Sequence, residues 1–116
     1  MSFRTRFLSF LGSVDFESIC GQGRGVADYI ELAKEFHTLM ISGVPKLGVH
    51  NDSEARRFIH LIDVLYEART KVIIGSVVAI DELYTGDRVG FEFDRTVSRL
   101  IEMQSDEYLC SAHLMS

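Results

Sequence analysis

The sequence predicts an α/β fold built on a parallel βαβ unit with flanking helices. Two short apolar runs, at residues 37–43 and 71–78, have the composition of buried strands, and a helical repeat of apolar residues over 51–70 separates them. A strand, a long helix and a second strand in this order join parallel strands through a right-handed crossover. A further helical pattern over 94–109 follows the unit. Three strands at most are visible, so we expect part of a sheet rather than a whole one.

Length and composition are those of one globular domain. The chain has 116 residues, 47% of them hydrophobic and 25% charged, which is enough to bury a core. A net charge of −5 and the lack of any Lys/Arg run argue against a nucleic-acid-binding protein. No apolar run approaches the roughly 20 residues of a membrane span, so no stable membrane insertion is expected.

The two cysteines, Cys20 and Cys110, have no metal-ligand spacing. In a chain of this size they are expected to be free thiols in a reducing compartment, with a single disulfide in a secreted protein as the alternative. The four histidines lie on different predicted elements without an HxH or HExxH pattern, so no metal site is expected.

Residues 1–13 are expected to form an N-terminal extension. Their start is basic, contains serine and lacks acids, as mitochondrial transit peptides do, but it is too short to decide the matter. Residues 14–20 are expected to be a short strand or turn entering a helical stub. The glycine-rich "GQGRG" at 21–25 lacks the GxxxxGK[ST] pattern of a phosphate-binding loop, so we interpret it as an ordinary loop.

The middle of the chain contains the clearest elements. Residues 26–36 place their apolar side chains on one helical face, and 37–43 form a strand that ends at a Gly-Val-Pro turn. In the helix over 51–70, Asn51 is expected to be the N-cap and Glu54 to complete a capping box. The near-continuous apolar run at 71–78 predicts a strand buried on both faces.

That central helix has two opposite faces. Its apolar face is expected to carry Phe58, Ile59, Ile62, Leu65 and Tyr66, and its polar face Arg56, His60, Asp63 and Glu67.

The last quarter is expected to hold a short helical turn at 80–88, closed at Gly86, and then the helix over 94–109. Residues 91–93 fit either a short strand or the entry to that helix. The residues expected to be buried on it are Phe93, Val97, Leu100 and Ile101.

Four arginines are the candidate functional residues. Arg95 and Arg99 lie one turn apart near the start of the last predicted helix, and Arg56 and Arg57 lie in the first turns of the central one. Basic residues are unfavourable at a helix N-terminus, and like charges at i and i+4 repel each other. An anion relieves both costs, because the planar guanidinium binds phosphate and carboxylate with two hydrogen bonds.

Three accounts of these arginines stay open. One is contact with phosphate, and another is a network of ion pairs inside the domain, for which Glu102 and Asp106 are the nearest acids of the last helix. The third is docking of a partner. Ser76 lacks the nucleophile pattern GxSxG, and Asp81 and Glu82 are expected to be helix-capping acids rather than catalytic ones.

Four long segments resemble the C-terminal part of the ZapE family. They are "DYIELAKEFHTLMISGVPKLG", "SEARRFIHLIDVLYEARTKVIIGS", "IDELYTGDRVGFEF" and "RTVSRLIEMQSDEYL", in this order. ZapE proteins are AAA+-related P-loop ATPases linked to bacterial cell division, with AFG-type relatives in mitochondria. The resemblance covers residues 14–114 and so assigns 14–116 to the C-terminal part of a P-loop NTPase fold. Residues 1–13 diverge from the family.

The resemblance implies that the full-length protein hydrolyses ATP with Mg²⁺. The family's Walker A loop, Walker B acids and sensor strand lie upstream of the part matched here, so the isolated chain is expected to bind no cofactor and to be inactive. Late arginines in AAA+ proteins often reach the nucleotide phosphates, which favours Arg95 and Arg99 first and Arg56 and Arg57 second.

The resemblance also implies partners and a location. The partners are the remainder of the ATPase domain and, in addition, the division protein FtsZ or other protein clients. The closer likeness to the bacterial branch favours the cytoplasm, with the mitochondrion as the alternative. The competing functional hypothesis is a stand-alone protein-interaction module that binds no nucleotide.

Overall fold

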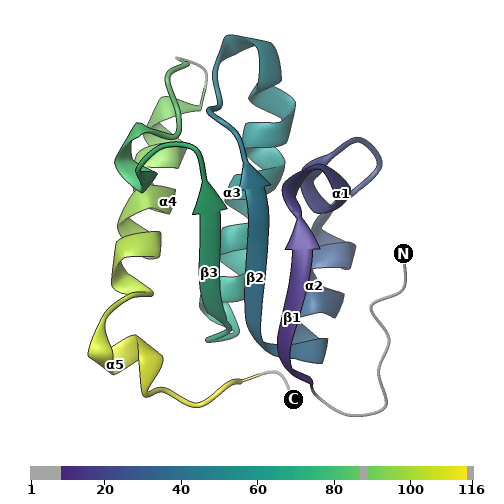
Figure 1. The fold of residues 1–116 in the computed structure, drawn as a ribbon, viewed down its shortest axis with the longest axis vertical. Coiled ribbons are helices and arrows are strands. Elements are labelled where there is room, and N and C mark those ends of the chain that lie inside the picture. Colours follow the sequence, from purple (N-terminus) through teal and green to yellow (C-terminus); the bar gives the residue numbers. More distant parts are fainter. Residues whose placement is uncertain (1–8, 87–88, 115–116) are drawn as a thin grey trace.

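The computed structural model describes residues 9–86 and 89–114, which form a three-stranded parallel sheet with helices packed against it (Figure 1). The predicted α/β class is confirmed. In chain order the elements are β1 (Ser9–Asp15), α1 (Phe16–Cys20), α2 (Val26–Glu35), β2 (Phe36–Val44), the 3₁₀ turn η1 (Val49–Asn51), α3 (Asp52–Glu67), β3 (Lys71–Ser76), the 3₁₀ turn η2 (Ile80–Glu82), α4 (Gly90–Glu102) and α5 (Asp106–Leu109).

The strands stand in the sheet in the order in which they occur in the chain, β1-β2-β3. The predicted βαβ unit of β2, α3 and β3 is therefore present, and a second one, β1 to β2 through α1 and α2, precedes it. β1 begins at Ser9, so residues 9–13, which the sequence assigned to the N-terminal extension, pair with β2. The rest of that extension lies outside the described residues.

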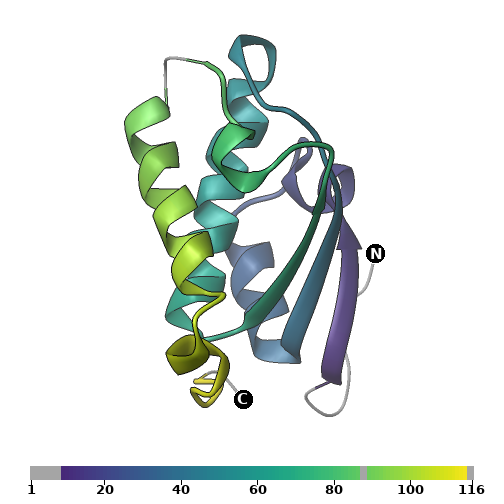
Figure 2. The ribbon, with the colours of Figure 1, turned by 60° about the vertical axis from the view of Figure 1, so that its left-hand side comes forward.

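All the long helices pack on one face of the sheet (Figure 2). Leu39 and Ile41 of β2 and Leu61 of α3 are fully buried between the two layers. The prediction that the third strand is buried on both faces is wrong: Val72 is buried, but Ile73 is 49% exposed. β3 ends at Ser76, two residues before the end of the apolar run. No described residues form a layer over the side chains on its outer face.

The loop at 21–25 is a loop, as predicted. Gly23 has a φ of 89°, in the left-handed region that favours glycine. The Asp28 carboxylate accepts a hydrogen bond from the Gly25 N–H (3.0 Å), and Arg24 lies 3.5 Å from the same carboxyl group. A carboxylate thus already occupies the helix end where a phosphate would bind, which fits the interpretation of this segment as a connection.

The N-terminus of α3 differs in detail from the predicted capping box. Asn51 is the N-cap residue, but its side chain makes no cap hydrogen bond to α3. Its Oδ1 instead accepts from the Gly48 N–H at 2.6 Å, across the preceding turn η1. The turn competes for the same side chain because Asn oxygen readily closes such short loops.

The last predicted helix is two helices. α4 begins at Gly90 and ends at Glu102, so residues 91–93 are the entry to this helix rather than a strand. α5 begins after Ser105, whose hydroxyl accepts a hydrogen bond from the Tyr108 N–H at 3.2 Å. Phe93 and Leu100 are buried as predicted, but Ile101 is 61% exposed. The position facing the core is Thr96, whose hydroxyl donates to the Glu92 carbonyl at 3.2 Å.

The predicted turn at 80–88 appears as η2, and residues 87 and 88 lie outside the described part. Tyr84, which follows η2, connects this turn to α3 and α4. Its hydroxyl donates a hydrogen bond to Asp52 of α3 (2.9 Å) and accepts one from the N–H of Val89, just before α4 (3.2 Å). Both thiols are free, as predicted, with Cys20 buried and Cys110 exposed.

The end of the chain crosses the amino ends of the strands. The Tyr108 hydroxyl is buried between the carbonyls of Leu65 (3.2 Å) and Thr70 (2.7 Å), and the Leu114 N–H donates to the Ala68 carbonyl at 2.9 Å. The Lys71 ammonium donates to the Ser111 carbonyl at 2.6 Å. These bonds hold α5 and the following residues against α3 and β3.

Candidate phosphate-contacting site

α3 and α4 both begin at the carboxyl ends of the strands (Figure 1). Ligands of open parallel sheets bind outside this edge. Arg56, Arg57 and Arg95 lie in the first two turns of these helices, but Arg99 lies in the last turn of α4. The prediction that Arg99 lies near a helix start is therefore wrong, because α4 begins at Gly90 rather than near residue 94.

The two helices run back alongside each other, and the rings of Phe58 and Phe93 stack between them with centroids 6.0 Å apart. This packing fixes which side chains of α4 face α3.

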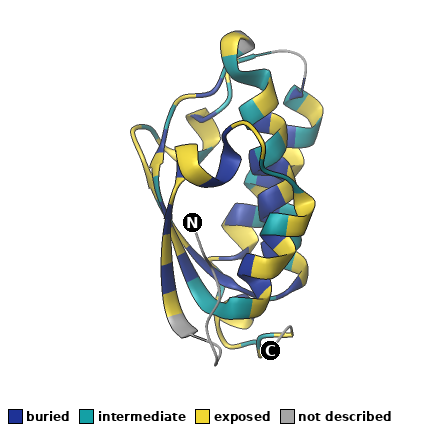
Figure 3. Ribbon diagram, turned by 90° about the vertical axis from the view of Figure 1, so that its right-hand side faces the viewer, coloured by how far each residue is buried: buried dark blue, intermediate teal, exposed yellow. Residues whose placement is uncertain are grey.

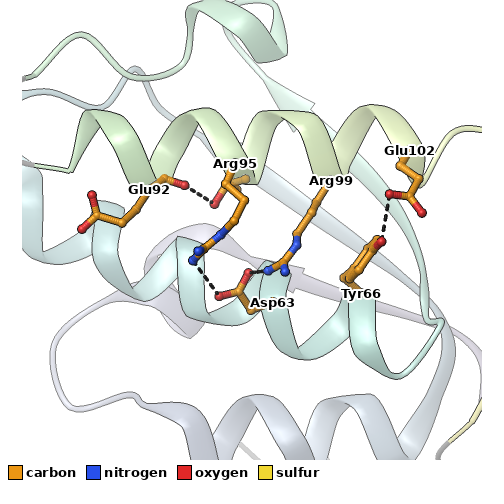
Figure 4. A network of polar contacts seen from close by, with 7 residues as sticks. Asp63, Tyr66, Glu92, Arg95, Arg99 and Glu102 are labelled. Atoms are coloured by element: carbon orange, nitrogen blue, oxygen red, sulfur yellow. Dashed lines mark hydrogen bonds and ion pairs between the residues drawn. The ribbon is translucent and has the colours of Figure 1, made fainter.

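Asp63 of α3 contacts both arginines of α4 (Figure 4). The Arg99 Nη1 donates a hydrogen bond to Asp63 Oδ1, and the Arg95 Nη2 lies 3.9 Å from Asp63 Oδ2. The sequence pointed to Glu102 and Asp106 as the nearest acids, but the partner comes from another helix. It lies on the polar face predicted for α3, and only the packing of α4 against that face brings it to the arginines.

Arg99 is held on two sides. Besides its bond to Asp63, its guanidinium lies 4.9 Å from the centroid of the Tyr66 ring, a cation–π contact. The Tyr66 hydroxyl in turn donates to Glu102 Oε1 at 2.8 Å, and this hydrogen bond raises the pKa of Tyr66 above its ordinary value. Arg99 therefore acts as part of the α3–α4 contact.

Arg57 is also used inside the fold. Its Nε donates to the carbonyl of Cys20 at 2.6 Å and ties α3 to the end of α1. Its direct neighbour Arg56 is exposed.

Arg56 and Arg95 line one small pocket between the two helices. The pocket has a volume of about 140 Å³, and its other lining residues are Ile59, His60, Asp63, Val89 and Glu92. The Arg95 side chain is 53% exposed, so its long ion pair with Asp63 is screened by water and weak. Two guanidinium groups, an imidazole and two carboxylates thus line a space large enough for a small anion.

The structure therefore divides the four candidates. Arg56 and Arg95 share a pocket, Arg99 lies one turn further along with Asp63, and Arg57 is apart from them. His60, which the sequence placed on the polar face of α3, joins the first two. Its spacing from Arg56, one helical turn, was the available signal.

A larger hollow, of about 560 Å³, lies at the opposite end of the sheet. Arg69, Glu102 and Tyr108 are among the residues that line it. It is formed by the chain end crossing the amino ends of the strands, the edge at which parallel sheets do not bind ligands. We therefore take the smaller pocket as the candidate site.

Two further observations concern the described residues, 9–86 and 89–114. They contain no group of three His, Cys, Asp or Glu side chains arranged to bind a metal ion. No helix among them is both long and apolar enough to span a bilayer.

A family model described as AFG1-like ATPase matches residues 6–112, and this stretch includes both helices and the pocket between them. The chain belongs to the AFG1-like ATPase family. The resemblance to ZapE proteins is thereby confirmed. No solved structure matches the chain.

Curated relatives of this AFG1-like chain come from bacteria and eukaryotes. It is 47% identical to the cell division protein ZapE of Escherichia coli, over 88% of this chain and 27% of the relative. It is 31% identical to the uncharacterized protein C115.02c of Schizosaccharomyces pombe (83% and 27%) and 30% identical to lactation elevated protein 1 homolog B of Danio rerio (92% and 28%). The AFG1-like chain thus spans about a quarter of the length of the relatives it matches.

Proposed function

We propose that this chain is the C-terminal portion of a ZapE-like ATPase domain, which hydrolyses ATP with Mg²⁺ when complete. The family match and the 47% identity to ZapE support this proposal. The chain itself has no GxxxxGK[ST] sequence, so the backbone cradle and lysine that bind the β- and γ-phosphates must come from elsewhere in the protein.

Within that domain, Arg56 and Arg95 contact the phosphates. The observation that carries this assignment is their shared pocket on α3 and α4, helices that both start at the ligand-binding edge of the sheet. In phosphoryl transfer a guanidinium stabilises the charge that develops on the phosphoryl oxygens. Arg99 serves as a positioning residue, because it fixes the Asp63 carboxylate that faces Arg95.

The complete protein acts in bacterial cell division, in the cytoplasm, on FtsZ or another protein client. The supporting facts are that the E. coli relative is a cell division protein and that the identity to it, 47%, is higher than to the two eukaryotic relatives at 31% and 30%.

A chimera of E. coli ZapE tests the arginine assignment. This chain replaces the matching stretch of ZapE, and ATP turnover is measured for Arg95→Ala and Arg56→Ala. Each should lower turnover by about tenfold or more and leave the free energy of unfolding within about 1 kcal/mol. Lys34→Ala, which removes an exposed cation of α2 far from the pocket, is the matched control and should turn over normally. Wild-type turnover in both arginine variants would contradict the assignment.

A further inference from the structure

The sheet has one face without helices. On that side each strand carries one large apolar side chain that is partly exposed: Leu11 of β1 (54%), Met40 of β2 (36%) and Ile73 of β3 (49%). In Figure 3 exposed residues alternate with buried ones along β1, as a sheet covered on a single face requires. Parallel sheets, in contrast, occur almost only with both faces covered.

The bare face follows from the topology. Each crossover connects a strand to its immediate neighbour, and both lead in the same direction across the sheet, from β1 to β2 and from β2 to β3. Because both crossovers are right-handed, their helices lie on the same face of the sheet. Coverage of the other face needs a connection that travels the opposite way. The described residues contain no such connection.

Register makes the exposed side chains a continuous patch. Met40 pairs with Ile73 on one side and with Ser13 on the other, and Leu11 lies one row further down beside Thr38. Ser13 and Thr38 are small and uncharged. Three strands about 4.8 Å apart span about the 10 Å diameter of one helix, so the patch has the width of a single helix.

We propose that this patch, made by Leu11, Met40 and Ile73, binds the apolar side of an amphipathic helix from the rest of the ATPase domain. The inference rests on the proposed function. The matched stretch is only 27% of ZapE, so the relatives carry ample chain to supply such a helix. A tether within one polypeptide also makes a small patch sufficient, because the contact is then intramolecular. Three side chains are too few for a stable dimer, which buries about 800 Å² on each partner.

Thiol accessibility tests the proposal in two proteins: this chain and the ZapE chimera described above. Met40→Cys is placed in each, on a background in which the exposed Cys110 is Ser, and labelling is followed peptide by peptide by mass spectrometry. Met40→Cys should react readily in the chain alone and at least about tenfold more slowly in the chimera, because a bound helix blocks the reagent. Ile101→Cys, at an apolar position of α4 that is 61% exposed, is the matched control and should react equally in both. Leu11→Cys repeats the test from another strand, in case Met40→Cys does not fold.

Three results would overturn the proposal. Equal rates for Met40→Cys in both proteins would mean that no helix covers the patch. An equal slowing of Ile101→Cys would show general burial rather than docking at this face. Protection in the chain alone that grows with protein concentration would identify a second copy as the occupant. Because the readout is labelling, an inactive chimera with a protected patch would count against the proposed function only.

Discussion

Asp63 of α3 accepts a hydrogen bond from Arg99 of α4, 36 residues further along the chain. Both side chains are about a quarter exposed, so water screens the pair only in part. We predict a coupling energy of about 1 kcal/mol between them, more than the few tenths typical of exposed pairs. A double-mutant cycle of Asp63→Ala and Arg99→Ala, followed by urea unfolding, measures it. Glu67→Ala, an exposed acid one turn later on α3, replaces Asp63→Ala in the control cycle and should show no coupling to Arg99.

Two adjacent arginines of α3 should behave differently. Arg57→Ala removes the donor to the buried carbonyl of Cys20 and should lower the free energy of unfolding by about 1–2 kcal/mol. Arg56→Ala changes an exposed side chain and should alter stability by less than about 0.5 kcal/mol. Denaturant titration of the two variants of this chain compares them directly, and equal losses would contradict the roles assigned here.

The chain alone should neither bind nor hydrolyse ATP. Without a phosphate loop, the pocket at Arg56 and Arg95 offers contacts to one or two oxygens and no site for the base or the metal. Calorimetric titration with ATP and Mg²⁺ should give no heat of binding at micromolar concentrations. Micromolar affinity in a preparation free of contaminating ATPases would refute this and would favour an independent nucleotide-binding protein.

Stability should fall at alkaline pH partly through Cys20. Burial raises the pKa of this thiol from 9.0 to about 12. Between these values the unfolded chain has lost the thiol proton while the folded chain retains it, so the free energy of unfolding decreases as pH rises from 9 towards 12. Urea titrations across this range should give a shallower decrease for Cys20→Ala than for the unmodified chain. Parallel pH profiles would contradict the predicted role of the thiol.

Local patterns predicted most elements, but they did not predict that helices cover only one face of the sheet. The helix at 26–36, the strand at 37–43 and the long helix after Asn51 were found because apolar spacing and turn residues act within a few residues. The apolar run at 71–78 suggested burial on both faces, yet a run of this kind reports only hydrophobicity. Whether helices lie above it depends on the winding of the whole sheet.

The candidate site could be predicted only in part for a similar reason. The spacing of Arg95 and Arg99, one helical turn apart, was visible in the sequence, but their partner Asp63 was not, because it depends on which face of α3 the next helix covers. The division of labour between Arg56 and Arg57 likewise depends on where α1 ends. Residue type indicated the chemistry, and tertiary packing decided which side chains remain available for it.

The sequential strand order bears on how the chain folds during synthesis. Every strand pairs with the strand made just before it, so no pairing has to wait for a distant segment. The two connections, residues 16–35 and 45–70, are single crossovers, and the entropic cost of closing such segments grows only slowly with their length. β1 and β2 can pair while α3 is still being translated, and β3 then adds to an existing edge. The bonds from Lys71 to Ser111 and from Leu114 to Ala68 can form only after residues 111–114 have been made.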